Sequence, residues 1–172
     1  MKLIVAMCQK TRGIGYKNNL PFRLIKDLER FKKLTIGNGN NAIIMGRKTW
    51  LSLPKRPLPN RTNIVISSNL NSSKSIIYKD PMLVLKDKHK YDDIWVIGGS
   101  DLYKFYLEKN LIKEIYLTEI ISANKKMDFD TYFPTISNNF TLVNNENIIH
   151  YEGVCMGPWL YKYKYVYKKY IK

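Results

Sequence analysis

Asp27 is a carboxylate placed within a run of residues that has helical periodicity. At about 100° per residue, residues 24–35 form an apolar stripe that consists of Leu24, Leu28, Phe31 and Leu34. Asp27 falls inside this stripe, whereas the other charged side chains point elsewhere: Lys26, Glu29, Arg30 and Lys33. Burial raises the pKa of a carboxyl group, which suits a group that handles protons near neutral pH. The pattern leaves open a plainer alternative, an acid in the first helical turn that backbone N–H groups satisfy.

Two glycine-containing turns each follow a strand-like run and precede a helix-like one. Residues 94–97 lead into Gly98-Gly99-Ser100-Asp101, and residues 42–45 lead into Gly46-Arg47-Lys48-Thr49. Glycine lets the backbone approach a ligand closely, and the free amides of a helix start favour phosphate. Either turn alone is weak evidence, because glycine often ends a strand only to turn the chain. Together they predict a ligand with phosphates at separated points, as in a dinucleotide, although neither turn is a Walker A loop and no G-x-G-x-x-G motif is present.

Residues 12–22 are rich in glycine and asparagine and end on a proline-phenylalanine pair. This composition predicts an irregular loop of about ten residues, which is long enough to act as a lid. The alternative is an ordinary surface connection.

Short apolar runs rich in β-formers alternate with helical patterns along most of the chain. Strands are expected at residues 3–8, 41–45, 62–67, 75–78 and 93–97, and helices at 24–35, 48–53, 80–88 and 100–109. Such alternation predicts a largely parallel α/β sheet. The last third contains strand patterns without helices between them, at 113–120, 141–149 and 160–170, so an antiparallel edge is expected there.

Tyrosine and lysine alternate strictly over residues 161–168. Period two places the tyrosines on one face of a strand and the lysines on the other. Aromatic stacking on single-stranded nucleic acid is one interpretation. A half-buried strand is favoured, because the two faces could not serve one ligand together.

The chain has 172 residues, with 29 Lys or Arg against 14 Asp or Glu, and a formal net charge of +15. This length predicts a single domain over residues 1–172. The charge predicts attraction to anions without saying which anion. Because the basic residues are scattered along the whole sequence, no specific nucleic-acid partner is expected.

The apolar start of the chain is short and is followed at once by polar residues 9–12, which favours a buried first strand over a signal peptide. No run approaches about 18 apolar residues, so no membrane span is expected. Cys8 and Cys155 match no metal-binding spacing, and no metal site is expected. A chain of this size needs no disulfide, which favours a reducing compartment, the cytoplasm.

Taken in order, these segments are similar to the dihydrofolate reductases. In the first part of the chain the resemblance is carried by Ile4-Val5-Ala6, Gly13-Ile14-Gly15, Asn18-Asn19-Leu20-Pro21, Asp27-Leu28, Phe31-Lys32 and Thr35. It continues in Ile44-Met45-Gly46-Arg47-Lys48-Thr49-Trp50, Arg56-Pro57-Leu58-Pro59-Asn60-Arg61 and Ile66-Ser67-Ser68. Further on it includes Ile97-Gly98-Gly99, Tyr103, Tyr116-Leu117-Thr118 and Asp130-Thr131-Tyr132-Phe133-Pro134. Order and spacing hold over roughly the first four fifths of the chain.

The resemblance implies a single α/β domain with a central, mostly parallel eight-stranded sheet flanked by helices and an antiparallel C-terminal edge. It implies reduction of 7,8-dihydrofolate to 5,6,7,8-tetrahydrofolate, by hydride transfer from NADPH to pterin C6 with protonation at N5, for one-carbon metabolism and thymidylate synthesis. The implied catalytic group is Asp27, Thr118, Phe22 and Leu20: Asp27 faces the pterin, Thr118 supports it, and Leu20 belongs to a mobile loop over residues 14–20. The implied substrate-binding residues are Val5, Ala6, Leu28, Phe31, Leu53 and Arg61, with the planar fork of Arg61 on the folate α-carboxylate.

The resemblance also implies which residues bind NADPH. They are Ala6, Met7, Ile14, Gly15, Gly46, Arg47, Lys48, Thr49, Ser67, Ser68, Ile97, Gly98, Gly99, Ser100, Asp101, Leu102 and Tyr103. Residues 46–49 with the two serines would hold the adenosine phosphates, including the 2′-phosphate. Gly98 and Gly99 match the cis Gly-Gly step of the family, and the helix that begins at Ser100 would receive the pyrophosphate.

Two positions depart from the family pattern. Phe22 stands where a tryptophan is usual, so an indole N–H that commonly holds a water near the pterin is missing. Phe129 stands where a smaller residue is common. Antifolate inhibitors are expected to bind and the protein is expected to be a monomer. A pyrimidine reductase of riboflavin synthesis shares the fold, but Asp27 and Arg61 favour folate.

Overall fold

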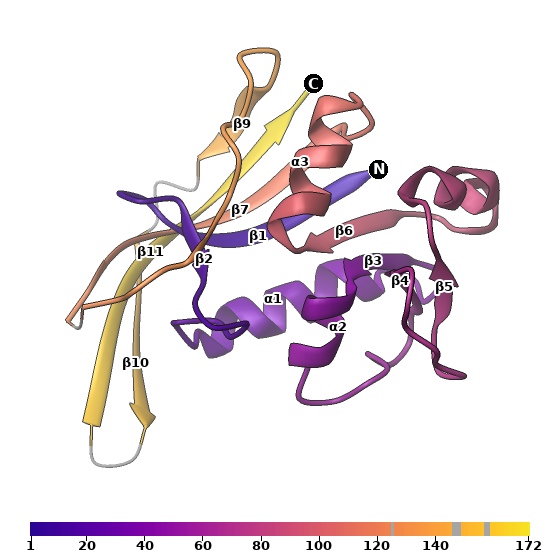
Figure 1. Cartoon of the computed structure of the whole chain (residues 1–172). Helices are drawn as coiled ribbons and strands as arrows, with labels where there is room; N and C mark the ends of the chain where they lie inside the picture. Colours follow the sequence, from indigo (N-terminus) through magenta and orange to yellow (C-terminus); the bar gives the residue numbers. More distant parts are fainter. Residues whose placement is uncertain (125, 146–148, 157–158) are drawn as a thin grey trace.

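The computed structural model describes residues 1–172 except for 125, 146–148 and 157–158, and its centre is one large β-sheet (Figure 1). The strands follow the order β10–β11–β7–β1–β6–β3–β4–β5, and β9 also pairs with β11. Their bounds are β1 Lys2–Cys8, β3 Ala42–Gly46, β4 Thr62–Ile66, β5 Ile76–Tyr78, β6 Ile94–Gly98, β7 Glu114–Ala123, β9 Thr141–Asn145, β10 His150–Met156 and β11 Trp159–Ile171. Because β9 and β10 pair with different parts of the same edge of β11, the sheet has the eight strand positions expected.

The six strands from β7 to β5 run parallel to their neighbours, and β11 turns antiparallel against β7. Residues 42–45 of β3 have no exposed surface. This full burial explains why the run is continuously apolar, since a central parallel strand is covered on both faces. The mostly parallel α/β fold with an antiparallel C-terminal edge is confirmed.

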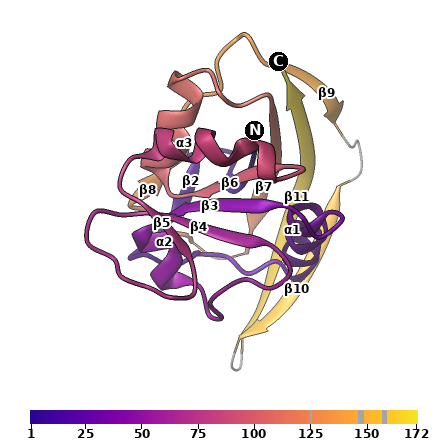
Figure 2. The same ribbon diagram turned by 90° about the vertical axis from the view of Figure 1, so that its right-hand side faces the viewer.

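Helices cover both faces of the sheet (Figure 2). Helices α1 (Ile25–Ile36) and α2 (Arg47–Ser52) pack on one face, where Phe31 and Trp50 join a cluster around Ile43 and Met45. Helix α3 (Ser100–Glu108) packs on the other face, together with η1 (Pro81–Lys90). In the described part of the chain, no helix is long and apolar enough to cross a membrane.

Three expected elements differ in the structure. The helix expected at 80–88 is a 3₁₀ helix, η1, whose start is capped by Asp80 through a hydrogen bond of 2.8 Å from the Met82 amide. The single strand expected at 141–149 ends at Asn145, and β10 begins at His150, with 146–148 outside the described residues. The loop expected at 12–22 contains a short strand, β2 (Gly13–Gly15), paired with β8 (Thr131–Tyr132).

The alternating tyrosines belong to β11, where Tyr163, Tyr165 and Tyr167 are 2%, 0% and 8% exposed. On the opposite face, Lys168 Nζ lies 2.5 Å from Glu119 Oε2. The interpretation of this segment as a half-buried strand is confirmed. Since the three rings are packed in the core, they are not available to stack on nucleic-acid bases.

Candidate active site

The carboxylate of Asp27 points from the first turn of α1 toward the sheet. Its Oδ1 atom accepts a hydrogen bond of 2.5 Å from Thr118 Oγ1 on β7, and Thr118 is 1% exposed. Burial is the largest influence on Asp27 and raises its pKa. The hydrogen bond from Thr118 and the charge of Arg30 act in the opposite direction, while the charge of Glu152 adds to the rise. A carboxyl group with a raised pKa is thus held against a hydroxyl that lies 91 residues away in sequence.

Arg30 lies close to this carboxyl group, and the expectation that its side chain points elsewhere is wrong. Its guanidinium carbon is 4.1 Å from the ring centre of Tyr167 and 5.9 Å from that of Tyr116. Positions three apart in a helix are neighbours, so Asp27 and Arg30 share one side of α1. The three-residue spacing is the sequence feature from which the proximity of Arg30 to Asp27 could have been predicted.

A different carboxylate caps the start of α1. Glu152 on β10 accepts hydrogen bonds from the backbone amides of Ile25 and Lys26. Leu24, the residue before the helix, has an apolar side chain and makes no side-chain cap. The alternative in which Asp27 serves only as the acid of the helix start therefore loses its support, since Glu152 carries out that function.

One face of β1 lies beside Thr118. In the parallel pairing, Ala6 is opposite Thr118 and Ile4 is opposite Tyr116, so their side chains share the face that α1 covers. Val5 points to the other face and is buried with the α3 residues. The expectation that the Val5 side chain lines the same pocket as Ala6 is therefore wrong, because neighbours in a strand alternate. Ile4 takes that position, and the same period of two could have revealed it.

Arg61 lies near the far end of α1. Its guanidinium donates to Thr35 Oγ1, its Nε donates to the Pro59 carbonyl at 3.0 Å, and its Cζ is 5.7 Å from the ring centre of Phe31. Partial burial lowers the pKa of Arg61. Leu53 packs in the same cluster as Phe31. These contacts hold a cation at the edge of an apolar surface.

Leu28 is 45% exposed, although the helical stripe predicts burial. Thr35, by contrast, has no exposed surface, and its hydroxyl donates to the Phe31 carbonyl at 2.7 Å. The buried line of α1 is thus rotated away from Leu28. An exposed leucine one residue from Asp27 leaves an apolar surface for a ligand.

The two glycine turns lie next to each other, at the carboxyl ends of β3 and β6. Met45 pairs with Gly98, and a Cβ atom added at Gly46 would lie 3.9 Å from the Gly99 amide nitrogen. The Gly98–Gly99 peptide bond is cis, as the resemblance implies. Gly98 has a φ of +124°, a backbone conformation that residues with a side chain rarely adopt. A Cβ atom added at Gly98 would lie 3.5 Å from Thr49 Oγ1. The turns that looked separate in sequence form one surface.

Side chains around this surface differ in what they can offer an anion. Arg47 and Lys48 are exposed at the start of α2. Ser68 is exposed too, but the Ser67 hydroxyl is occupied within its own turn, where it accepts from the Leu70 amide at 3.1 Å. The positive charges and Ser68 are therefore accessible, and Ser67 shapes the turn.

Most of the first residues of α3 make hydrogen bonds or packing contacts within the protein. The amides of Leu102 and Tyr103 both donate to the Gly99 carbonyl at 3.1 Å, and their side chains are buried. These two residues hold the turn, and their contact with a cofactor stays a prediction. The Ser100 hydroxyl donates to the Tyr132 carbonyl at 2.5 Å, and Asp101 is exposed. Ile97 is partly buried against the α1 and α2 side of the sheet.

The segment expected as an irregular loop is a hairpin tied to residues 130–133. The Tyr16 amide donates to the Asn19 carbonyl at 2.9 Å, across a turn whose two central residues have positive φ. Lys17 N–H donates to Asp130 Oδ2 at 2.7 Å, and the Asp130 amide donates to Gly15 O at 3.0 Å. Backbone pairing therefore orders this segment, and the name hairpin loop is used below for residues 13–20.

The members of the hairpin loop have different environments. Ile14 is buried in the same cluster as Met7, whereas Leu20 is 61% exposed. The structure thus brings Ile14 beside β1 and leaves the side chain of Leu20 in solvent.

A family model described as dihydrofolate reductase matches residues 1–156. Curated relatives include dihydrofolate reductases of Drosophila melanogaster, 36% identical over 80% of this chain and 81% of that protein, and of Buchnera aphidicola, 42% identical over 76% of this chain and 77% of that protein. The dihydrofolate reductase of Gallus gallus is 37% identical over 77% of each chain. The chain belongs to the dihydrofolate reductase family. It is an oxidoreductase.

The two residues that depart from the dihydrofolate reductase pattern, Phe22 and Phe129, pack in one hydrophobic cluster. Phe22 is 4% exposed and packs in a cluster with Leu24, Ile120, Val154 and the buried tyrosines of β11. Phe129 lies at the edge of the same cluster. A Cβ atom added at Gly13 would fall 2.1 Å from the Phe129 ring. The large Phe129 side chain thus occupies space that only a glycine at position 13 leaves free.

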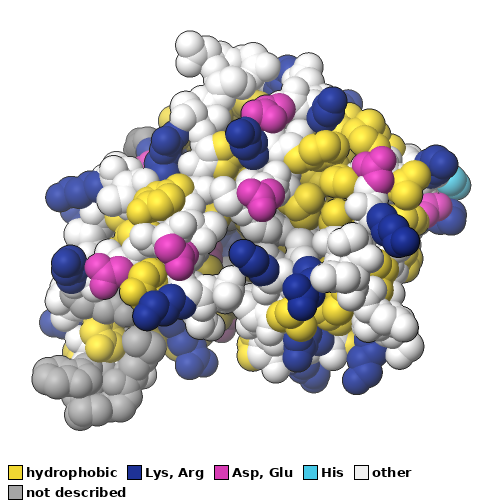
Figure 3. Space-filling model, viewed as in Figure 1, with side chains coloured by type: hydrophobic (Ala, Val, Ile, Leu, Met, Phe, Trp, Pro, Cys, Tyr) yellow, Lys and Arg dark blue, Asp and Glu magenta, His cyan; other side chains and the backbone are white. Residues whose placement is uncertain are grey.

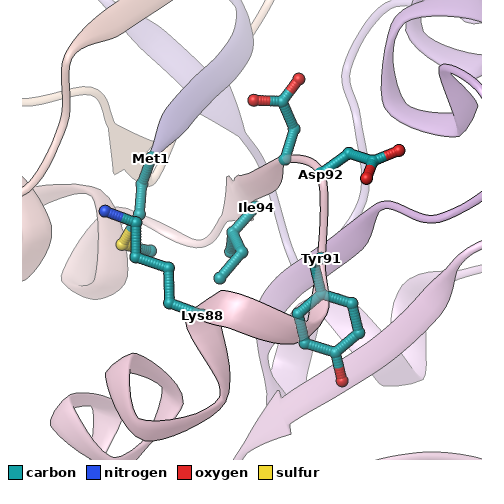
Figure 4. A pocket seen from close by; sticks show the side chains of 6 residues that line it. Met1, Lys88, Tyr91, Asp92 and Ile94 are labelled. Carbon is teal, nitrogen blue, oxygen red and sulfur yellow. The ribbon is translucent and has the colours of Figure 1, made fainter.

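A small pocket elsewhere in this dihydrofolate reductase family member is lined by Met1, Lys88, Tyr91, Asp92, Asp93 and Ile94 (Figure 4). It lies at the amino ends of β1 and β6, whereas Thr118 pairs with the carboxyl half of β1. Burial lowers the pKa of the Met1 amino group there. The pocket is separate from Asp27 and contributes no group to its chemistry. Over the described residues, no cluster of His, Cys, Asp and Glu could hold a metal ion.

Proposed function

We propose that this chain reduces 7,8-dihydrofolate to 5,6,7,8-tetrahydrofolate with NADPH, acting as a single domain over residues 1–172. The observation that carries the proposal is the partly buried Asp27 carboxyl group, held by the buried Thr118 beside an apolar surface, in a member of the dihydrofolate reductase family. The activity named for the relatives requires a group that can handle a proton next to the flat pterin ring. Asp27 has the raised pKa that such a role needs.

The proposed substrate surface is formed by Ala6 and Ile4 on the sheet, and by the helix residues Leu28 and Phe31. The pterin would lie against Asp27, whose carboxylate orients it by hydrogen bonds while Thr118 holds the carboxylate in place. Arg61 would bind the folate α-carboxylate through its planar fork. Its contacts with Pro59 and Phe31 already restrain that fork, so less entropy is lost on binding.

The residues around the glycine turns suit an anionic cofactor such as NADPH. Gly46 and Gly99 leave open backbone where a Cβ would stand. The start of α3 has no side-chain cap, so the amides of Ser100 and Asp101, ahead of the two that bind the Gly99 carbonyl, can receive a phosphate. The Asp101 carboxylate in that first turn opposes a phosphate, which makes the accessible charges of Arg47 and Lys48 more important. We assign Arg47 to the 2′-phosphate.

When bound, NADPH supplies the hydride that goes to pterin C6. The protein orients the substrate, excludes water and favours protonation at N5. Asp27 acts on the proton through its raised pKa, and we assign the delivery of the proton to N5 to a water. Ile14 and the rest of the hairpin loop cover the reacting rings, and the buried Phe22 forms part of the apolar wall behind them.

We also propose a cytoplasmic location, a small-molecule partner and a monomeric state. Cys8 and Cys155 are free cysteines, which supports a cytoplasmic location. The Lys and Arg side chains on the face shown in Figure 3 are spread out and interleaved with acidic ones, which supports a small-molecule partner over nucleic acid. We expect a monomer that binds antifolate inhibitors.

The test is the oxidation of NADPH by purified protein in the presence of dihydrofolate, followed by its absorbance from acidic to alkaline pH. We expect turnover by the wild type and a loss of orders of magnitude in Asp27→Asn, with NADPH binding retained. The matched control is Asp92→Asn, which makes the same charge change at an exposed position near the amino ends of the strands. A wild type without turnover at any pH would refute the function, and full activity of Asp27→Asn would refute the mechanism.

A further inference from the structure

Glu152 links the C-terminal hairpin to the start of α1. It lies on β10 and is 9% exposed, and its two carboxylate oxygens accept from the backbone amides of Ile25 and Lys26, the latter at 3.4 Å. Tyr165 on β11 donates its hydroxyl to Glu152 Oε2 at 3.1 Å in a buried contact. The carboxylate is therefore fixed from two sides, by the strand pair and by the helix. Figure 2 shows α1 beside β10 and β11.

This contact replaces a cap that the local sequence lacks. The first amides of a helix have no partner within the helix, and a serine, threonine or aspartate before the helix usually supplies one. Leu24 occupies that position and cannot. Glu152 supplies the acceptor from 127 residues away and adds a negative charge at the end of the helix where the dipole favours it.

Asp27 is the next residue after the two amides that Glu152 binds. The backbone that carries the Asp27 side chain is therefore held by Glu152, while the carboxyl group itself is held by Thr118. Among the described residues, the charged and titratable groups that act on Asp27 come from three elements: Arg30 on its own helix, Glu152 on β10 and Tyr167 on β11. Glu152 is the only carboxylate among those named, and its charge opposes that of Arg30.

We propose that Glu152 is a positioning residue for Asp27: from β10 it fixes the first turn of α1 and offsets the charge of Arg30 at the Asp27 carboxyl group. The proposal deepens the proposed function and rests on it for its catalytic meaning. It assigns the C-terminal hairpin a part in the site without any contact between the hairpin and the substrate.

The proposal predicts a change in the titration of Asp27. In Glu152→Gln the amide oxygen can still accept from Ile25, but the negative charge is gone. Because that charge raises the pKa of Asp27, its removal must lower this pKa. We expect a shift of roughly half a pH unit, less than the one to three units that a charge in direct contact produces.

The carboxyl carbon signal of Asp27, followed by NMR as a function of pH in the ligand-free full chain, measures this shift. The signal is assigned by comparison with Asp27→Asn. No substrate or cofactor is present, so the result is valid whether or not the chain reduces dihydrofolate. The matched control is Glu108→Gln, which removes one negative charge from an exposed position on α3. An unchanged Asp27 titration in Glu152→Gln, or an equal shift in Glu108→Gln, would overturn the proposal.

Kinetics give the second readout. A reaction that needs the proton held near Asp27 slows as the pH rises through its pKa. In Glu152→Gln this decline in kcat should begin at lower pH, with KM for dihydrofolate changed less than twofold. A role limited to stability would lower the amount of folded enzyme and leave the pH profile in place, which would contradict the proposal.

If Glu152→Gln does not fold, hydrogen exchange in the wild-type protein tests the proposal. The amide protons of Ile25 and Lys26 should exchange with solvent at least tenfold more slowly than those of an uncapped helix start, because the buried carboxylate accepts both. Exchange at the rate of an unstructured peptide would refute the cap and with it the proposal.

Discussion

Replacement of Asp27 by asparagine should lower the activity and raise the stability of this protein. The carboxylate is partly buried, and in the described part of the chain it receives a single side-chain hydrogen bond, from Thr118. Asparagine has nearly the same shape, and its amide oxygen can still accept from Thr118. It carries no charge, however, so it can neither orient a pterin as a carboxylate does nor hold a proton for it.

The activity should fall by about 10²–10⁴-fold, the usual contribution of a positioned acid or base. The gain in stability follows from the direction of the pKa. The pKa of Asp27 is raised above its ordinary value of 3.8 by burial, so ionisation costs stability in the folded state. We expect Asp27→Asn to gain about 1–2 kcal/mol in unfolding free energy at neutral pH, within the range for an incompletely paired buried polar group.

The sign of the effect sets its pH range. Below the unfolded pKa near 3.8 the carboxyl group is protonated in both states, and the wild type has no penalty. The penalty grows as the pH rises toward the folded pKa and is complete above it. The advantage of Asp27→Asn should therefore be present at about pH 8 and small at about pH 4. Urea unfolding of both proteins at several pH values measures this difference.

Asp130→Asn is the control of opposite sign. Hydrogen bonds from the Lys17 amide and the Thr131 hydroxyl lower the pKa of Asp130. Its loss should destabilise the protein at neutral pH, and the effect should vanish as the pH falls through the folded pKa of Asp130. The reasoning fails if Asp27→Asn is less stable than the wild type at neutral pH, or if its advantage is the same at every pH.

Three further predictions concern the cofactor surface, the hairpin loop and the contact between α3 and β1. Arg47→Ala should weaken NADPH binding about tenfold more than NADH binding, the equivalent of about 1.4 kcal/mol; equal losses in fluorescence titrations would contradict the 2′-phosphate assignment. Gly13→Ala should destabilise the protein by about 1–3 kcal/mol through overlap with the Phe129 ring, and adding Phe129→Ala should restore part of the loss in thermal unfolding; additive losses would argue against the overlap. Tyr103→Phe should cost about 1–2 kcal/mol, because the buried hydroxyl donates to the Ile4 carbonyl at 2.9 Å; urea unfolding without any change would refute this.

Much of the fold could be predicted because it depends on short-range patterns. The first strand was expected at 3–8 and spans Lys2–Cys8, and the helix expected at 24–35 spans Ile25–Ile36. Apolar periodicity sets such elements within a few residues, and it also placed Asp27 on the side of α1 that meets the sheet. The prediction of burial failed for Leu28, which belongs to the apolar stripe of the helix and yet is 45% exposed.

The sequence by itself thus determined most strands and helices, the acid that faces the sheet and, through its motifs, the family. Only the tertiary structure decided what surrounds Asp27. Thr118 and Glu152 lie 91 and 125 positions further along the chain, and no local pattern brings them to this carboxyl group. Their approach depends on β7 lying next to β1 and on β10 crossing the start of α1, and these are packing choices of the whole sheet. For this reason the sequence around position 27 determines that a carboxyl group is present, whereas the fold determines where this group lies and what its pKa is.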